Sequence, residues 1–551
     1  MKNFIILSLV LLASNLFAGQ VFYVTTSGSD SNDGKSWVTA FANVQSAIDA
    51  AARVATSESP SEVWISRGTY KHGSAMTMKN NVAIYGGFAG TETRKEERVV
   101  GNETILDGEG EYRVFYNKYT KSNPLTNSAK LDNVTIQNGY SASDDGGGMY
   151  NSSSSPTLTN CTFSGNSAKY DGGGMYNSYS SPVLTNCTFT NNSASLDGGG
   201  MHNYFSSPTL TNCTFSGNSA SSDGGGMYNI SSSPVLTNCT FSGNSASYNG
   251  GGMYNSGGSP VLTNCTFSGN SASSGGGMHN YFSSPTLTNC TFSGNSAEDY
   301  GGGMYNRGSS SPTLTNCILW GNTTTFGGNE IYNYDSYSKP TIDTCIIQNG
   351  KSGIYNSGYC TFTTELITTD PKLMPLGNYG GSVQTCPVGA GSSAIGTGKV
   401  VEGVSTDARG FARSETAPTI GACEYKSEFD NWAENAGLSG YNAKPTATPH
   451  NDGITNLEKF VFGLDGSRAT SYGANPNFKH SVEGGVASFQ FPVRKDASGI
   501  SVKLMMSNDM SNWEEADAVS IGESGEFNLF NYSVPLPLNG KLFFKLKVLE
   551  K

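Results

Sequence analysis

Four aspartates stand 26 residues apart, each directly before the sequence Gly-Gly-Gly-Met. They are Asp145, Asp171, Asp197 and Asp223. Residues that recur at a fixed interval of this length occupy equivalent places in stacked units, so a column of carboxylates is expected. Like charges about 5 Å apart repel by roughly 1 kcal/mol in water, a cost that Ca²⁺ would relieve. Because Asn249 and Ser274 end the column, both a calcium ladder and a row of solvated turn residues stay open.

A second series of residues that could contact a ligand is aromatic. Each Gly-Gly-Gly-Met is followed by Tyr or His, giving Tyr150, Tyr176, His202, Tyr228, Tyr254, His279 and Tyr305. Neighbours on a strand face opposite sides, so these rings are expected to point outward from buried methionines. Further aromatic residues lie beside them: Tyr179, Tyr204, Phe205, Tyr281 and Phe282. An outward aromatic strip suits stacking on sugar rings, and the alternative is a structural ladder of self-stacked rings.

Catalytic groups are sparse in this region. Between Gly146 and Asn322 the basic residues are Lys169 and Arg307. The neighbouring carboxylates of Asp144 and Asp145 would point to opposite faces of a strand. We therefore assign no catalytic residue, and a general base would have to be sought in the less regular stretch 62–132.

The eleven cysteines are odd in number, so at least one is unpaired in any disulfide scheme. Most recur at one position of the repeat, which makes their Cβ vectors parallel rather than convergent. The spacing therefore predicts buried free thiols.

The elements that position these side chains are short strands. The sequence repeat that begins at Gly146 recurs at Gly172, Gly198, Gly224, Gly250, Gly275 and Gly301. Each copy holds short β-branched or alternating runs between turn residues, which predicts three short strands per repeat. One repeat cannot bury its own apolar face, so the copies must stack as a parallel β-helix. We expect its interior to hold columns of Met, Leu, Cys and Phe, with an Asn ladder at the corner that contains Asn160.

The paired motifs GGGM[YH]N and FxxN, as in Phe163–Asn166, resemble the repeats of polymorphic outer-membrane proteins. That resemblance implies a right-handed parallel β-helix of the pectin-lyase-like superfamily, exposed at the cell surface. After Asp370, the stretches NYGG, SAI, DARG and IGA resemble the closing region of choice-of-anchor β-helix proteins. This closing region is expected to form the last coils and a cap.

A second metal candidate lies near the C-terminus. The segment 452–458 reads DGITNLE and resembles calcium-binding repeats of the pattern DxDxDGxxNxxE. Asp452 and Asn456 fit that pattern, whereas His450 and Lys459 stand where carboxylates are expected. Calcium needs several oxygen ligands, so a metal-free linker between short helices is the other interpretation.

The predicted fold class is all-β, in four parts. Residues 1–18 form a signal peptide. Residues 19–80 form an N-terminal cap with a helix and the first coil. Residues 81–425 form the parallel β-helix, with regular repeats at 146–322. Residues 426–551 form short helices and a small β-sandwich-like module.

Net charge and hydropathy limit the classes of partner that this protein could bind. With 33 basic against 44 acidic residues the net charge is −11, which disfavours binding to nucleic acid. After the signal peptide no stretch has the ~20 apolar residues of a membrane span. We expect a secreted or cell-surface protein, outer-membrane-associated or extracellular, that binds a polysaccharide or another surface partner without catalysis. The alternative is a polysaccharide lyase or glycoside hydrolase. An ice-binding face of outward threonines is a third hypothesis, and calcium is the one cofactor considered.

Overall fold

The computed structural model describes residues 19–99 and 101–427, together with 479–483, 486–495, 500–507, 514–516, 519–524, 527–535 and 543–550. The chain forms two compact units, Met1–Tyr425 and Lys426–Lys551. The predicted signal peptide and the candidate calcium ligands Asp452 and Asn456 lie outside the described residues.

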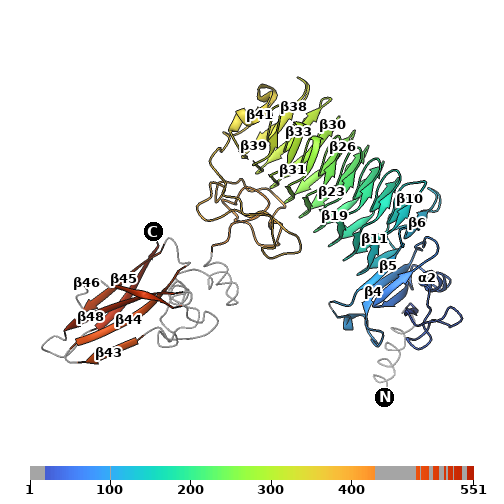
Figure 1. Cartoon of the computed structure of the whole chain (residues 1–551), viewed down its shortest axis with the longest axis horizontal. Coiled ribbons are helices and arrows are strands. Elements are labelled where there is room, and N and C mark those ends of the chain that lie inside the picture. Colours follow the sequence, from blue (N-terminus) through green and yellow to red (C-terminus); the bar gives the residue numbers. More distant parts are fainter. Residues whose placement is uncertain are drawn as a thin grey trace, which may run out of the picture. The chain divides into compact units, whose positions relative to one another are not determined.

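The first unit is a parallel β-helix (Figure 1). Four parallel sheets of 13, 11, 10 and 8 strands run along it. One regular coil contributes one strand to each sheet: β14 (Met175–Ser178), β15 (Val183–Thr185), β16 (Thr188–Thr190) and β17 (Ser193–Ala194). The repeat thus has four strands, and the prediction of three is wrong because it omitted the two-residue strand β17. Each strand pairs with the equivalent strand of the next coil, so that Met175 is opposite Met201. The predicted fold class is confirmed.

The N-terminal end is covered by a helix, as predicted. Helix α2 (Val44–Ala52) packs beside β1 (Val21–Val24) and β2 (Ser61–Ser66). Its buried residues are Val44, Ala47, Ile48 and Ala51, the side that the sequence spacing indicates. The helix thereby closes the apolar interior of the first coil, which would otherwise be open to water.

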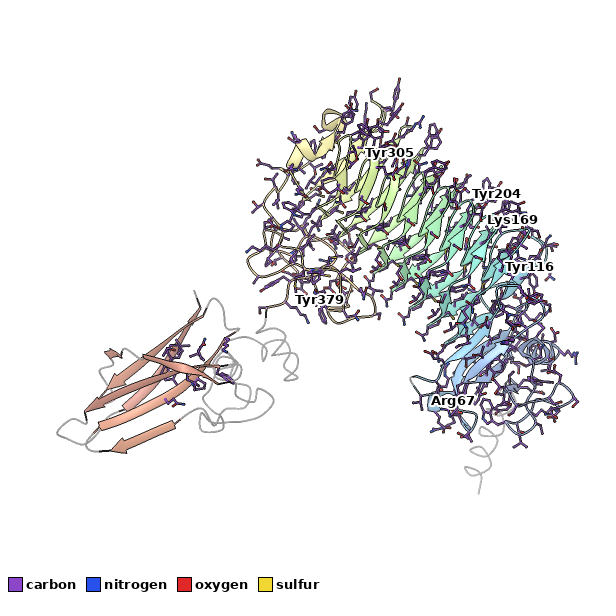
Figure 2. All side chains as sticks on the ribbon, in the orientation of Figure 1. Arg67, Tyr116, Lys169, Tyr204, Tyr305 and Tyr379 are labelled. Atoms are coloured by element: carbon purple, nitrogen blue, oxygen red, sulfur yellow. The ribbon has the colours of Figure 1, made fainter. Side chains whose placement is uncertain are left out.

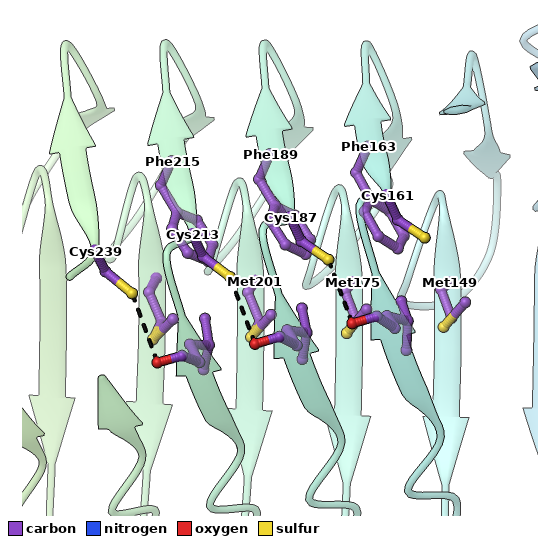
Figure 3. Packing of buried hydrophobic residues seen from close by; sticks show 14 of the residues in the cluster. Met149, Cys161, Phe163, Met175, Cys187, Phe189, Met201, Cys213, Phe215 and Cys239 are labelled. Carbon is purple, nitrogen blue, oxygen red and sulfur yellow. Dashed lines mark hydrogen bonds between the residues drawn. The ribbon is translucent and has the colours of Figure 1, made fainter. Parts of the chain in front are cut away.

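The interior consists of columns of identical side chains (Figure 3). The predicted Met, Leu, Cys and Phe positions are all buried, and the rings of Phe163 and Phe189 stack with centroids 4.5 Å apart. Each thiol of the Cys column points to a carbonyl of the preceding coil, as Cys187 Sγ does to Leu158 O at 3.7 Å. All eleven cysteines lie in the described residues and none forms a disulfide. The predicted stacks and free thiols are confirmed.

Asparagine ladders run through the corners. The predicted ladder at Asn160 is present, with Asn186 Nδ2 donating to Asn160 Oδ1 at 3.1 Å. Two further ladders are fully buried, and sequence analysis missed them. In one of them Asn192 Nδ2 donates to Asn218 Oδ1 at 2.9 Å and to Phe163 O at 3.0 Å. These amides satisfy backbone groups at bends that leave the sheets.

This buried ladder ends on a carboxylate. Asn322 Nδ2 donates to Glu330 Oε2, and Glu330 is only 1% exposed. Burial raises the pKa of Glu330 from 4.5 to about 8. The folded pKa lies above the unfolded one, so the contribution of Glu330 to stability is greatest below pH 4.5 and is lost as pH rises toward 8.

Replacing Glu330 by Gln removes this ionisation. We expect E330Q to raise the free energy of unfolding by about 3 kcal/mol at pH 7, because the ionised form no longer has to be neutralised on folding. Urea unfolding of both proteins at pH 4 and pH 7 tests it. The two proteins should be about equally stable at pH 4; an equal difference at both pH values would contradict the assignment.

The segment after Pro371 adds no further coil. The last ladder strand is β42 (Thr361–Phe362), and residues 371–425 turn back along the outside of earlier coils. We call residues 371–425 the strap. Its contacts include Thr240 Oγ1 to Gln384 O (2.6 Å), Asn264 Nδ2 to Thr406 O (2.9 Å) and Ala422 N to Thr291 Oγ1 (3.0 Å).

The strap contradicts the predicted closing coils and bears on the ice-binding hypothesis. The prediction that this segment forms the last coils is wrong, because its carbonyls and amides pair with outward Thr and Asn side chains instead of with a preceding coil. Outward threonines at Thr240, Thr266 and Thr291 are buried. A continuous exposed threonine face, as ice binding would need, is therefore interrupted.

The second unit is described only through its strands. They form an antiparallel sheet of four strands and another of three. The strands are β43 (Lys479–Glu483), β44 (Val486–Arg494), β45 (Ile500–Ser507), β46 (Glu514–Ala516), β47 (Val519–Ser524), β48 (Phe527–Pro535) and β49 (Phe543–Glu550). Antiparallel pairing throughout agrees with the predicted small β-module.

Candidate binding face on the β14 sheet

The aromatic and acidic columns lie on the outer side of the 10-stranded sheet that contains β14. Figure 2 labels Tyr116, Lys169, Tyr204 and Tyr305 along this side of the β-helix. The other strands of the sheet are β6 (Phe115–Lys118), β10 (Met149–Ser152), β18 (Met201–Tyr204), β22 (Met227–Ile230), β26 (Met253–Ser256), β30 (Met278–Tyr281), β34 (Met304–Arg307), β38 (Ile331–Asn333) and β41 (Ile354–Tyr355). We call this surface the β14 face.

The predicted aromatic column is a continuous stack. From Tyr150 to Tyr305 the ring centroids of successive members are 4.5–5.3 Å apart. Tyr150, Tyr176 and Tyr228 are half-buried, whereas His202, Tyr254, His279 and Tyr305 are buried. Four of the seven rings are buried and the other three are only half-exposed, so little of their surface is open to a sugar. Of the two interpretations, this geometry supports the structural ladder.

Exposed rings stand at the corner that follows these strands. Tyr179, Phe205 and Phe282 are 62%, 47% and 59% exposed. Tyr179 and Phe205 stack in parallel with centroids 5.3 Å apart, and Tyr204 meets Phe205 edge to face at 4.7 Å. The ring of Tyr281 lies 4.4 Å from that of Phe282. We call Tyr179, Tyr204, Phe205, Tyr281 and Phe282 the aromatic ridge.

The backbone under the ridge is unusual for aromatic residues. Tyr179, Phe205 and Phe282 have φ values of 48°, 47° and 49°. Equivalent positions in other coils carry Ser153, Ser231 and Gly257, also at positive φ. A bulky residue in the left-handed region is rare and strained, by about 1 kcal/mol. Small residues adopt the same backbone conformation at this corner in other coils, so the fold does not require the three rings.

The opposite border of the β14 face carries a second exposed column, at the turn before the glycines. Tyr170, Leu196, Tyr248 and Phe326 are 40–63% exposed. Backbone bonds such as Leu196 N to Tyr170 O (3.0 Å) hold their turns in register. Sequence analysis missed this border, although its members are one residue before the aspartate column.

The four aspartates form the predicted column, and all four are half-buried. Each Oδ1 accepts the amide of the next turn, as Asp171 does from Asp197 N at 3.1 Å. Burial raises the pKa of Asp171 to about 7 and that of Asp223 to about 6. Burial also lowers the pKa of His202 to about 3, which keeps its imidazole neutral. The calcium ladder at these residues stays a prediction.

A polar pocket of about 440 Å³ lies in the early coils, within the stretch where a general base would be sought. Lys71, Asp107 and Glu109 line it. Lys71 Nζ is 2.8 Å from Glu109 Oε1, and this contact raises the pKa of Lys71, which disfavours its use as a base. Burial opposes ionisation of Asp107, but hydrogen bonds led by that from Gln137 hold its pKa below the ordinary value. The pocket therefore presents fixed charges.

The family model described as right handed beta helix region matches residues 70–261 and 228–372. These two matches span more than half of the 551 residues. The chain therefore belongs to the right-handed β-helix family. No curated protein matches the sequence significantly.

Three solved structures align with this chain at low similarity. A pectate lyase aligns over 74% of this chain and 96% of its own at 14% identity, with a TM-score of 0.40. A tailspike of an Acinetobacter phage aligns over 89% and 79% at 10% identity, with a TM-score of 0.28. A pectin methylesterase from Erwinia chrysanthemi aligns over 61% and 80% at 14% identity, with a TM-score of 0.18. Similarities this low assign no activity.

None of the helices in the described parts of the chain has the length and hydropathy needed to cross a membrane.

Proposed function

We propose that this protein binds an uncharged polysaccharide, without catalysis, through the aromatic ridge of the β14 face. The observation that carries the proposal is the placement of Tyr179, Phe205 and Phe282. Their rings are exposed on strained backbone that Ser and Gly occupy in neighbouring coils. Strained residues that the fold does not require indicate selection for contact with something outside the fold.

The surface chemistry favours sugars. The C–H face of a pyranose ring packs on an aromatic face, while its hydroxyls form hydrogen bonds with polar neighbours. The half-buried residues Ser152, Ser178 and Ser256 lie on the outward side of the same strands. Tyr179 and Phe205 lie on successive coils, and Phe282 lies three coils beyond Phe205, roughly 15 Å away, so one extended sugar chain could contact both groups of rings. Arg307 lies over the ring of Tyr281, 5.9 Å from its centroid. The aspartate column of the same face would repel a polyanion, so a neutral glycan fits best.

The proposed location is the cell surface or the extracellular space. Support comes from the predicted signal peptide at residues 1–18 and from the resemblance of the repeats to polymorphic outer-membrane proteins. The resemblance of the strap to choice-of-anchor closing regions is consistent with attachment of the C-terminal part to a surface.

A binding and turnover screen tests this proposal. The chain from Gly19 is incubated with a panel of neutral and acidic polysaccharides, with and without calcium. Retained protein, new reducing ends and unsaturated-product absorbance are measured together. Retention on a neutral polysaccharide without product supports the proposal, whereas formation of product or retention only on polyanions contradicts it.

The second candidate function is cleavage of a polysaccharide in the pocket of the early coils. The position of one lysine and two acidic residues, Lys71, Asp107 and Glu109, in the lining of a single pocket supports it. If product appears in the screen, E109Q should abolish it while F205S leaves it unchanged. That result would move the active site to this pocket.

A further inference from the structure

Two aspartates and a histidine converge at one point of the β14 face. Donor atoms of Asp171, Asp197 and His202 all lie within 4.8 Å of one another. Asp197 occupies the turn that leads into β18, where His202 lies, and Asp171 occupies the equivalent turn of the preceding coil. The cluster therefore joins two coils.

The imidazole of His202 is buried without a hydrogen bond. Its side chain is 5% exposed, and its Nδ1 has no partner among the described residues. Its Nε2 faces Asp171 Oδ2 at 3.7 Å, which exceeds hydrogen-bond distance. The ring is fixed by Tyr176 and Tyr228, whose centroids are 5.0 Å and 4.8 Å away. A buried polar nitrogen without a partner is costly, and at His202 two carboxylates lie close enough to share a ligand with the ring.

The two carboxylates are oriented by the ladder. Asp171 Oδ1 accepts Asp197 N at 3.1 Å, and Asp197 Oδ1 accepts Asp223 N at 3.0 Å. One oxygen of each is thereby fixed by the backbone. Asp171 Oδ2 faces His202 Nε2 at 3.7 Å, and the Asp197 carboxylate also has a side-chain hydrogen bond with Ser222, which a bound metal ion would have to displace or share. One neutral imidazole with two carboxylates is a ligand set for Zn²⁺ or Co²⁺, whereas Ca²⁺ requires six to eight oxygens.

We propose that Asp171, Asp197 and His202 bind one divalent transition-metal ion, with Zn²⁺ as the representative. Zinc ligands lie about 2.1 Å from the ion, which places donors roughly 3.5 Å apart. Short rotations of the two aspartate side chains bring the three donors to that spacing. Water, or a hydroxyl of a bound ligand, completes the coordination on the outer side.

The chain contains a matched control for this site. His279 occupies the equivalent position of a later coil, between Tyr254 and Tyr305, and is also buried with an unpartnered Nδ1. The positions equivalent to Asp171 and Asp197 are Asn249 and Ser274 there. His279 therefore has the same burial without the carboxylates, and it should bind no metal.

The test is equilibrium dialysis of the untagged full chain against Zn²⁺, together with the visible spectrum of the Co²⁺ form. We expect one high-affinity ion per chain. H202Y should weaken binding at least 100-fold and remove the imidazole-dependent Co²⁺ bands, while H279Y changes neither. D171N should weaken binding at least tenfold. Tyr is native at the positions equivalent to His202, and Asn at the position equivalent to Asp171, so both variants suit the fold.

Three outcomes would overturn the site. One is the absence of a high-affinity Zn²⁺ ion in the unmodified chain. Another is equal loss of binding in H202Y and H279Y. The third is Ca²⁺ binding that D171N abolishes and H202Y leaves intact, which would establish the calcium ladder instead. Unfolding temperatures of all variants are measured without metal, so that a folding defect is recognised.

Discussion

Replacing Tyr179, Phe205 and Phe282 together by serine is expected to lower the affinity for the bound polysaccharide about 100-fold. Each ring that stacks on a sugar is assigned about 1 kcal/mol, and 1.4 kcal/mol corresponds to a factor of ten. Serine is native at Ser153 and Ser231 with the same backbone conformation. The triple variant should therefore fold, with an unfolding temperature close to that of the parent. Affinity is measured by calorimetry with the polysaccharide identified in the screen.

The converse substitution extends the test. Ser231 is the equivalent of Phe205 in the next coil, where the ridge is interrupted. We expect S231Y to increase affinity up to tenfold, since it adds a ring to the stack. Y337S, which removes a 72% exposed ring from a later turn, serves as the control and should change nothing. A folded triple variant that binds like the parent would refute the ridge as the binding surface.

Replacing Asn218 by alanine is expected to destabilise the β-helix by about 4 kcal/mol. Asn218 Oδ1 accepts from the backbone amide and Nδ2 of Asn192, at 3.0 Å and 2.9 Å. Its Nδ2 donates to Phe189 O at 2.9 Å and to Asn244 Oδ1 at 2.9 Å. Alanine leaves several of these buried groups unsatisfied, each at a cost of about 1–3 kcal/mol. Urea unfolding measures the loss.

The corner ladder provides the matched comparison. Asn212 has φ 54° and is only half-buried, so water can replace its side-chain hydrogen bonds. Glycine adopts this backbone readily, and N212G should cost no more than about 1 kcal/mol. Similar losses for N218A and N212G would contradict the distinction between the buried and the corner ladder.

The residues of the core could be predicted because identical residues recur at a fixed interval. Each one therefore stacks on its equivalent in the next coil. The positions of Met149, Leu158, Cys161 and Phe163 follow from alternation within short strands. The buried ladder at Asn166 could not, because a polar residue beside Gly165 looks like part of an ordinary surface turn. The strap was missed for another reason: its contacts join residues as distant as Asn264 and Arg413, which no local pattern encodes.

The candidate site was predicted in part. Alternation placed the ring of Tyr176 outward, but it could not show how closely the rings of adjacent coils cover one another. The exposed rings depend on a left-handed corner, which the sequence does not indicate for an aromatic residue such as Phe205. The Asp–His cluster requires Asp171 and His202 from different coils to meet. That proximity depends on how the coils are offset, which periodicity alone leaves undetermined.

The contacts of the strap limit where whole repeats can be gained or lost during evolution. Its partners extend from Thr240 to Asp343, and each lies on a defined coil. Gain or loss of a whole copy within that interval would displace the partners by about 5 Å per coil. These contacts do not restrict the number of repeats between Gly146 and Thr240. Unequal recombination between their near-identical segments can lengthen or shorten the array there, so the length of the β14 face is a heritable variable that leaves the fold intact.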